Sequence, residues 1–198
     1  MISEFWQWFA EGSAKLAHDP QNQDVIGELD RRVAATWPGL AWEIGPDPSG
    51  AWYLALSPNL DRERMALAEE AVASAPPIPG WRLYSARQRK LWDGRFVLET
   101  AEGDVELDVA AWRYVLLDYP DKTNEVLLFG PQAEGLTEDQ RWHAAATALE
   151  GMLGEQCVLD HVDSFALEST VSAQFQKQAK PIDDLPRAFD RVVKEFRG

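Results

Sequence analysis

Three carboxylates alternate with apolar residues in one short segment of the sequence: Asp104, Glu106 and Asp108 are separated by Val105 and Leu107. In an extended strand, successive side chains point to opposite faces, so the three carboxylates share one face while the apolar side chains enter the core. Aligned oxygens can bind Mg²⁺ or Ca²⁺ weakly, but the segment lacks the glycine and the spacing of a calcium loop. We interpret it as a solvated acidic face that protects a strand edge from aggregation and that can bind a cationic partner.

A second group of residues has the opposite charge. Residues 82–95 contain five Lys or Arg and one Asp, with aromatic residues between them. The candidate anion-binding side chains in this segment are Arg87, Arg89, Lys90 and Trp92. Such a mixture can hold an anionic ligand or stack a single-stranded base. The structural interpretation, which we prefer, is a hairpin whose arginines pair with the acidic remainder of the chain.

His161 is the best candidate for a general base. Alternation in residues 156–167 predicts a long strand, which would place His161 on the same face as Asp163 and Cys157. A carboxylate beside an imidazole can orient it as a base. The sequence shows no nucleophile near it, so we expect a structural strand histidine. The alternative is an enzyme that acts on a small anionic substrate, with His161 as its base and Asp163 orienting it.

Familiar cofactor and metal motifs are missing from the sequence. Neither the phosphate-binding pattern G-x-x-x-x-G-K nor the hydrolase pattern G-x-S-x-G occurs. The histidines His18, His143 and His161 are too far apart in the sequence to suggest a zinc site. We therefore expect no cofactor and no metal, and we assign no catalytic residue.

The composition points to a basic protein as the partner. The 198 residues include 33 Asp or Glu against 19 Lys or Arg, a formal net charge of −14. This charge repels nucleic-acid phosphates and anionic lipid, so we expect neither as a partner. A single cysteine, Cys157, favours a reducing compartment. The first residues do not resemble a signal peptide, and no run of 18 apolar residues occurs, so we expect a cytoplasmic location.

The order of elements predicts an α+β fold in a single domain, residues 1–198. Apolar periodicity predicts helices at about 3–17, 26–37, 61–75, 137–153 and 185–196, with Thr137 and Gln140 as a capping box. Strands are expected between them, and the helices should pack on a mainly antiparallel sheet. The order strand, strand, helix, strand occurs at 40–87 and again at 112–168, which suggests two related ββαβ halves side by side in one sheet.

Three stretches of the sequence carry a family resemblance. They are Phe5-Trp6-Gln7-Trp8-Phe9, Trp42-Glu43-Ile44-Gly45 and the junction Ala75-Pro76-Pro77-Ile78-Pro79-Gly80-Trp81. In these stretches the first half of the chain resembles an uncharacterised family of acidic bacterial proteins. The resemblance implies a bacterial cytosolic α+β protein and carries over no catalytic residue.

These observations favour a binding or regulatory protein, of the kind that acts as an immunity protein or inhibitor toward a basic protein partner. A carboxylate-rich face would speed association, and aromatic anchors at its centre would hold the complex. Two other hypotheses stay open: the His161 enzyme, and a structural subunit that self-associates through its aromatic N-terminal helix. The sequence does not determine the oligomeric state.

Overall fold

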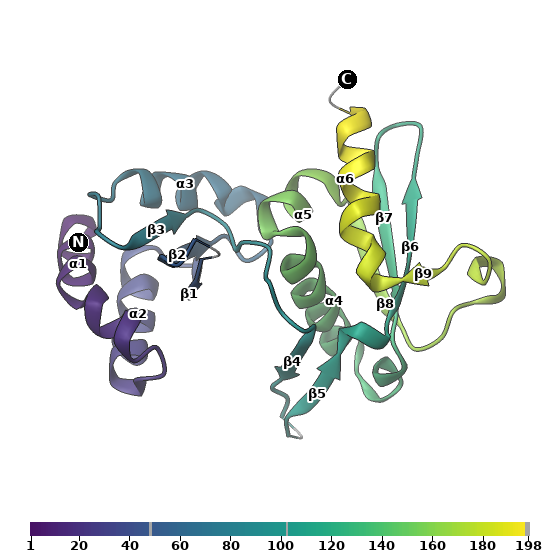
Figure 1. Cartoon of the computed structure of the whole chain (residues 1–198), viewed down its shortest axis with the longest axis horizontal. Helices are drawn as coiled ribbons and strands as arrows, with labels where there is room; N and C mark the ends of the chain where they lie inside the picture. The colour runs from purple at the N-terminus through teal and green to yellow at the C-terminus, as the bar shows by residue number, and fades with distance from the viewer. Residues whose placement is uncertain (48, 102, 197–198) are drawn as a thin grey trace. The chain divides into compact units, whose positions relative to one another are not determined.

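The computed structural model describes residues 1–47, 49–101 and 103–196, and it has the expected α+β fold. Within these residues the chain forms six α-helices and nine strands, which make three mostly antiparallel sheets (Figure 1). The chain divides into two compact units, Met1–Gln88 and Arg89–Gly198. The first unit contains one of these sheets and the second contains two, and each unit is described separately below.

The first unit is built on a three-stranded sheet of order β1-β2-β3. The hairpin strands β1 and β2 are antiparallel, as expected, and β3 lies parallel to β2. The helix α3 packs against β2 and β3, and α2 contacts β1. In chain order the elements are α1 (Ile2–His18), α2 (Gln23–Thr36), β1 (Ala41–Pro46), β2 (Trp52–Ser57), η1 (Arg62–Arg64), α3 (Met65–Ala73) and β3 (Trp81–Tyr84).

Aromatic side chains of α1 form the centre of the first core. Phe5, Trp6 and Phe9 are fully buried, and Phe5 meets Trp37 edge to face at 4.7 Å between ring centroids. The indole N–H of Trp6 donates to Ser74 Oγ at 3.0 Å, so the polar group of this buried side chain has a hydrogen-bond partner. Phe5, Trp6 and Phe9 of the N-terminal helix therefore pack within their own unit.

The second unit contains a two-stranded ribbon, β4-β5, and a four-stranded sheet of order β8-β7-β6-β9. The helix α4 packs against β8, and α6 packs against β6 and α4. The segment around Phe175 packs on Val115 and covers the other face of the sheet. In chain order the elements are β4 (Arg95–Leu98), β5 (Val105–Asp108), η2 (Val109–Ala111), β6 (Arg113–Asp118), β7 (Asn124–Phe129), η3 (Pro131–Gly135), α4 (Glu138–Leu153), α5 (Glu155–His161), β8 (Ser164–Glu168), η4 (Ala173–Phe175), β9 (Lys180–Pro181), η5 (Ile182–Asp184) and α6 (Leu185–Phe196).

The recurring ββαβ order has the same topology in both units. In each, an antiparallel hairpin is followed by a helical crossover, and the third strand lies parallel to the second on its free side. The two copies lie in separate sheets, which corrects the expectation that they sit side by side in one sheet. A common origin for residues 40–87 and 112–168 remains a prediction.

The strand expected over residues 156–167 is wrong in its first half. Gly154, with φ +82°, ends α4 and begins the short helix α5, and β8 starts only at Ser164. The buried residues Glu155, Val158, Leu159 and Val162 follow the spacing i, i+3, i+4, i+7 of one helix face. In a helix of only seven residues, the apolar positions fit both this helical spacing and the two-residue alternation of a strand, so the sequence pattern did not separate the two.

The start of α4 agrees with the sequence prediction. The Thr137 hydroxyl accepts from the Gln140 backbone N–H, and the Gln140 side chain accepts from the Thr137 backbone N–H. The helix α1 begins at Ile2, one residue before the expected start, with Met1 as its N-cap. None of the helices in the described residues has the length and apolar character needed to span a membrane.

Candidate functional site

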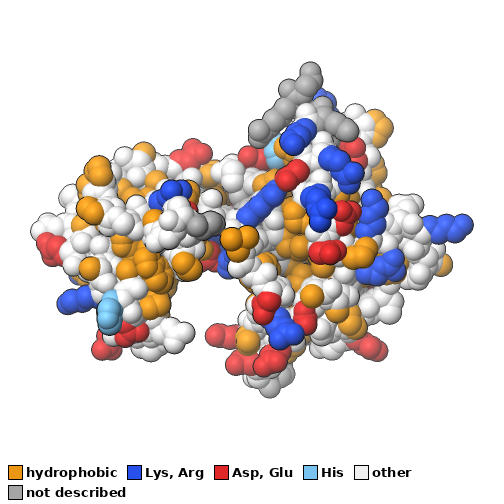
Figure 2. Space-filling view, viewed as in Figure 1, with side chains coloured by type: hydrophobic (Ala, Val, Ile, Leu, Met, Phe, Trp, Pro, Cys, Tyr) orange, Lys and Arg blue, Asp and Glu red, His pale blue; other side chains and the backbone are white. Residues whose placement is uncertain are grey.

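The β4-β5 ribbon presents the predicted acidic face. Its register pairs Arg95 with Asp108 and Val97 with Glu106, and directly paired residues share a face. Phe96, Leu98, Val105 and Leu107 therefore lie on the opposite, apolar face, where Leu107 is buried. We call the face with Val97 and Glu106 the outer face of the ribbon. Figure 2 shows carboxylates gathered over this part of the second unit.

The three predicted carboxylates differ in their surroundings. Asp108 accepts from the Ala110 backbone N–H at 3.0 Å and lies 3.5 Å from the Arg95 guanidinium, so it caps the following turn and is partly neutralised. Asp104 and Glu106 are exposed, and within the described residues neither forms an ion pair or a side-chain hydrogen bond. The charge of the outer face therefore comes mainly from Asp104 and Glu106, together with the exposed Glu99, which sequence reasoning did not single out.

An apolar side chain stands in the middle of these charges. Val97 is 52% exposed and lies directly across the ribbon from Glu106. A hollow of about 590 Å³ lies beside the ribbon and is lined by Arg95, Phe96 and Val97 of β4, by Glu106, Leu107 and Asp108 of β5, and by Gln132. Gln132 is held by the indole N–H of Trp112, which donates to its side-chain oxygen at 3.2 Å. The arrangement offers an apolar contact with carboxylates on its rim.

The predicted anion-binding residues are divided between the two units. Arg87 belongs to the first unit and donates to Asn59 at 3.4 Å, whereas Arg89, Lys90 and Trp92 belong to the second. Arg89 donates to Asp190 at 2.6 Å and to the Leu153 carbonyl at the end of α4 at 2.9 Å.

Three other basic residues of segment 82–95 also have partners within their own units. The Lys90 ammonium lies over the Trp92 ring at 5.9 Å from its centroid. Arg82 and Arg95 pair with Asp47 and Asp108, both at 3.5 Å. Arg82, Arg89 and Arg95 pair with acidic residues as in the structural interpretation, although the segment does not form the expected hairpin.

The arrangement expected around His161 is also corrected. His161 is the last residue of α5, not a strand residue, so it has no alternating face in common with Asp163 and Cys157. The Asp163 carboxylate accepts from the Asn124 backbone N–H at 2.8 Å, and its own N–H donates to the Asn124 carbonyl. Within the described residues no hydrogen bond joins the side chains of His161 and Asp163. Asp163 thus fixes the start of β7 and does not orient the histidine.

Cys157 is a half-buried residue of α5, and its thiol interacts with the Arg89 guanidinium. Burial raises the pKa of its thiol, and the Arg89 guanidinium opposes that shift. The thiol is therefore protonated near neutral pH and a poor nucleophile. No group of three or more His, Cys, Asp or Glu side chains is arranged to hold a metal ion in the described ranges.

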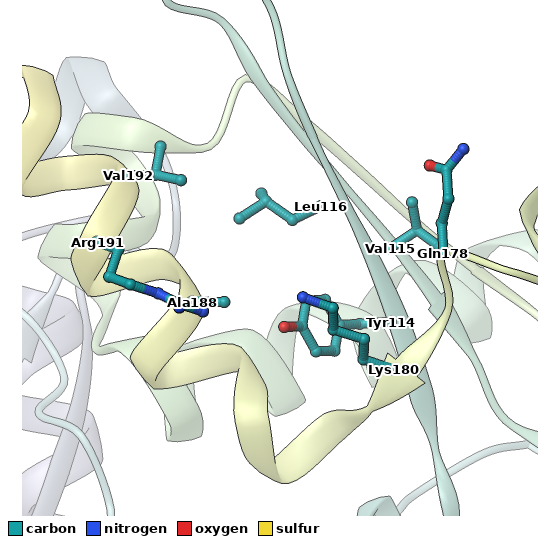
Figure 3. Close-up of a pocket in the computed structure, with 8 residues that line it drawn as sticks. All are labelled: Tyr114, Val115, Leu116, Gln178, Lys180, Ala188, Arg191 and Val192. Carbon is teal, nitrogen blue, oxygen red and sulfur yellow. The ribbon is translucent and has the colours of Figure 1, made fainter.

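Sequence reasoning missed a basic groove in the second unit. The groove has a volume of about 500 Å³ and lies between β6, the segment before β9 and α6, with Lys180 and Arg191 at its sides (Figure 3). The signal was present in the sequence, because residues 169–198 contain six Lys or Arg and only four Asp or Glu. The excess of basic residues in this segment is hidden in the composition of the whole chain, because the chain has a net charge of −14.

The outer face of the ribbon and the basic groove are thus the two surfaces whose geometry suggests binding. No family model, curated protein or solved structure matches this chain.

Proposed function

We propose that this chain is a binding protein that holds a basic protein partner on the outer face of the β4-β5 ribbon. The observation that carries the proposal is an exposed apolar residue, Val97, directly across the ribbon from Glu106. Within the described residues Glu106 and Asp104 form no ion pair, whereas Asp108 pairs with Arg95. A regulatory or inhibitory role toward that partner, in a bacterial cytoplasm, is part of the same proposal.

The electrostatics of this face support fast association. Glu106 lies on β5, Asp104 directly precedes that strand, and Glu99 directly follows β4. Carboxylates this close create a negative field that attracts Lys and Arg of a partner and raises the association rate. The field of the whole chain, with its net charge of −14, acts in the same direction.

The apolar part of the face supplies a reason for the complex to persist. Exposed ion pairs contribute about 0–1 kcal/mol each, so carboxylates alone give weak binding. Burying Val97 under a partner side chain removes apolar area from water at roughly 25 cal/mol per Å². A basic partner segment with one apolar residue between its cations matches this face, because it fills the hollow and pairs with the rim.

The test is a quantitative pull-down from a bacterial lysate with three baits. They are the natural chain, the double variant Asp104→Lys/Glu106→Lys, and the matched control Glu69→Lys/Glu70→Lys. Glu69 and Glu70 are exposed on α3 in the first unit, so the control makes the same change in net charge on the other unit. Captured proteins are identified and quantified by mass spectrometry.

We expect a basic protein that the natural chain and the α3 control retain and that the ribbon variant loses. Its retention should also fall as salt rises from about 50 to 500 mM, because screening shortens the range of the field. Equal loss in both variants would show that total charge, not the ribbon, binds the partner. Equal retention in both would remove the ribbon from the interface.

A further inference from the structure

Half of the strand β6 has an open edge. On one side β6 pairs with β7 along its whole length, from Arg113 to Asp118. On the other side β9 pairs with only two of its residues, Arg113 and Tyr114. In the described part of the chain, no strand lies beside residues 115–118 on that side. Figure 1 shows β9 next to the lower half of β6 and no strand next to the upper half.

The chain leaves this edge for a local reason. Gln178 and Ala179 donate their backbone N–H groups to the Phe175 carbonyl, so the chain before β9 is held in a turn and cannot pair with β6. Pro181 follows directly after Lys180 and has no N–H group to donate. The short β9 is thus fixed at both ends, and the remaining edge of β6 stays open.

Backbone alternation identifies the groups that face the open edge. Tyr119 donates its backbone N–H to the Thr123 carbonyl, and Ile182 donates to the Trp112 carbonyl. In antiparallel pairs the hydrogen-bonded positions recur every second residue. Residues 113, 115 and 117 therefore bond to β7, while the N–H and C=O groups of Leu116 and Asp118 point toward the open edge.

A groove with two cations borders this edge. It is lined by Leu116 of β6, by Lys180, and by Ala188, Arg191 and Val192 of α6 (Figure 3). Lys180 and Arg191 are exposed, and neither forms an ion pair with another described residue. Tyr114 also lines the groove and is 2% exposed. Its hydroxyl donates to Asp184 at 3.2 Å, so this hydroxyl already has a hydrogen-bond partner within the chain.

We propose that this groove binds an extended acidic peptide segment of a partner protein. The segment adds as a strand to the open edge of β6, bonding to the backbone of Leu116 and Asp118. Its carboxylates lie against Lys180 and Arg191, and its apolar side chains contact Leu116 and Val192. The site is separate from the outer face of the β4-β5 ribbon and has the opposite charge.

Two observations favour a peptide over other anions. The open backbone groups of Leu116 and Asp118 are spaced to match another strand, and strand addition to an exposed edge is an established mode of peptide recognition. Nucleic acid would meet a repulsive field, because residues 89–198 contain 21 Asp or Glu against 12 Lys or Arg. A small anion could reach the two cations but would leave the strand edge unused.

The Asp118 carboxylate gives the site a polarity. It is exposed at the far end of β6, away from Lys180 and Arg191. A peptide carboxylate placed beside it would be repelled, so the acidic residues of the segment belong at the end of the groove near Lys180. The same carboxylate discourages pairing between edges of two copies, since charged residues on open strands oppose such association.

The test uses a fluorescein-labelled, acetylated peptide of seven residues, with valine at positions 1 and 3, glutamate at positions 5 and 7 and serine between them, so that both residue types share one face of the strand. Its binding is measured by fluorescence anisotropy. The site variant is Lys180→Glu/Arg191→Glu. The matched control is Lys177→Glu/Arg187→Glu, which makes the same charge change at exposed positions that do not line the groove. A second peptide has the same sequence with alternate backbone nitrogens methylated, so its charge is kept and its strand pairing is lost.

We expect the site variant to bind the peptide at least tenfold more weakly than the natural chain, and the control variant to bind within about twofold of it. The methylated peptide should also bind at least tenfold more weakly. In amide hydrogen exchange, peptide should protect Leu116 and Asp118, while Leu117, already bonded to β7, should not change. Equal binding of both peptides, full competition by 10 mM succinate, or no binding at about 1 mM protein would each overturn the proposal.

Discussion

Gly130 lies against the ring of Trp112, and adding one methyl group there should destabilise the second unit. The backbone at Gly130 is extended, and its N–H donates to the Glu168 carbonyl at 2.9 Å, which fixes it to β8. A Cβ built on Gly130 would lie 2.5 Å from Trp112 Nε1 and 2.7 Å from Cε2. Trp112 is only 1% exposed, so the ring has little free space into which to move.

The expected cost combines two effects. Forcing an extra carbon into a packed core typically costs about 1–3 kcal/mol. The displaced indole would also lose its hydrogen bond to Gln132, worth about 1 kcal/mol net. We therefore expect Gly130→Ala to lower the free energy of unfolding by roughly 2–4 kcal/mol.

The assay is urea denaturation followed by far-UV circular dichroism, with Gly135→Ala as the matched control. Gly135 lies five residues along the chain, and a Cβ there would meet no atom within 4 Å. We expect the midpoint of the control to stay close to that of the natural chain. A Gly130→Ala midpoint that also stays there would refute the packing of Trp112 against this backbone.

Three further outcomes follow from single residues. Gly12→Ala, inside α1 with no atom within 4 Å of the new Cβ, should raise the free energy of unfolding by up to about 1 kcal/mol in the same denaturation assay. Thr137→Ala should lower it by about 0.5–2 kcal/mol, because the N-cap of α4 is lost; an unchanged midpoint would contradict the capping box. Hydrogen bonds from Arg89 lower the pKa of Asp190, so this pair stabilises the fold above the ordinary carboxyl pKa of 3.8, and that stability is lost as pH falls through the lower folded value. In the Asp190→Asn variant, the free energy of unfolding should therefore fall less steeply as the pH is lowered below about 4. An unchanged pH dependence would contradict a stabilising Arg89–Asp190 ion pair.

Elements with strong local signals could be predicted from the sequence. The capping box at Thr137 and the two successive strands β1 and β2 formed as expected, because each depends on neighbouring residues. The helix α5 was missed, because seven residues are too few to separate a helical period from alternation. The parallel pairing of β2 with β3 depends on contacts between distant segments and left no local signal.

In the candidate surfaces, too, the local features could be predicted from the sequence and those that depend on contacts between strands or distant segments could not. The shared face of Glu106 and Asp108 followed from strand alternation, and the register of the ribbon agrees with it. The sequence did not predict that Asp108 is the carboxylate that forms an ion pair, because its partner Arg95 comes from the other strand of the ribbon. The groove beside Lys180 depends on where a two-residue strand ends, and this is determined by the turn around Phe175.

The central claim, that the outer face of the ribbon binds basic protein segments, is tested most directly by nuclear magnetic resonance. The ¹⁵N-labelled chain is titrated with a peptide of four lysines around one central leucine, and amide shifts are mapped onto the structure. We expect the largest changes at Val97, Glu99 and residues 104–108, with little change at Glu69 and Glu70. Changes of equal size at the α3 carboxylates, or none on the ribbon, would contradict the claim.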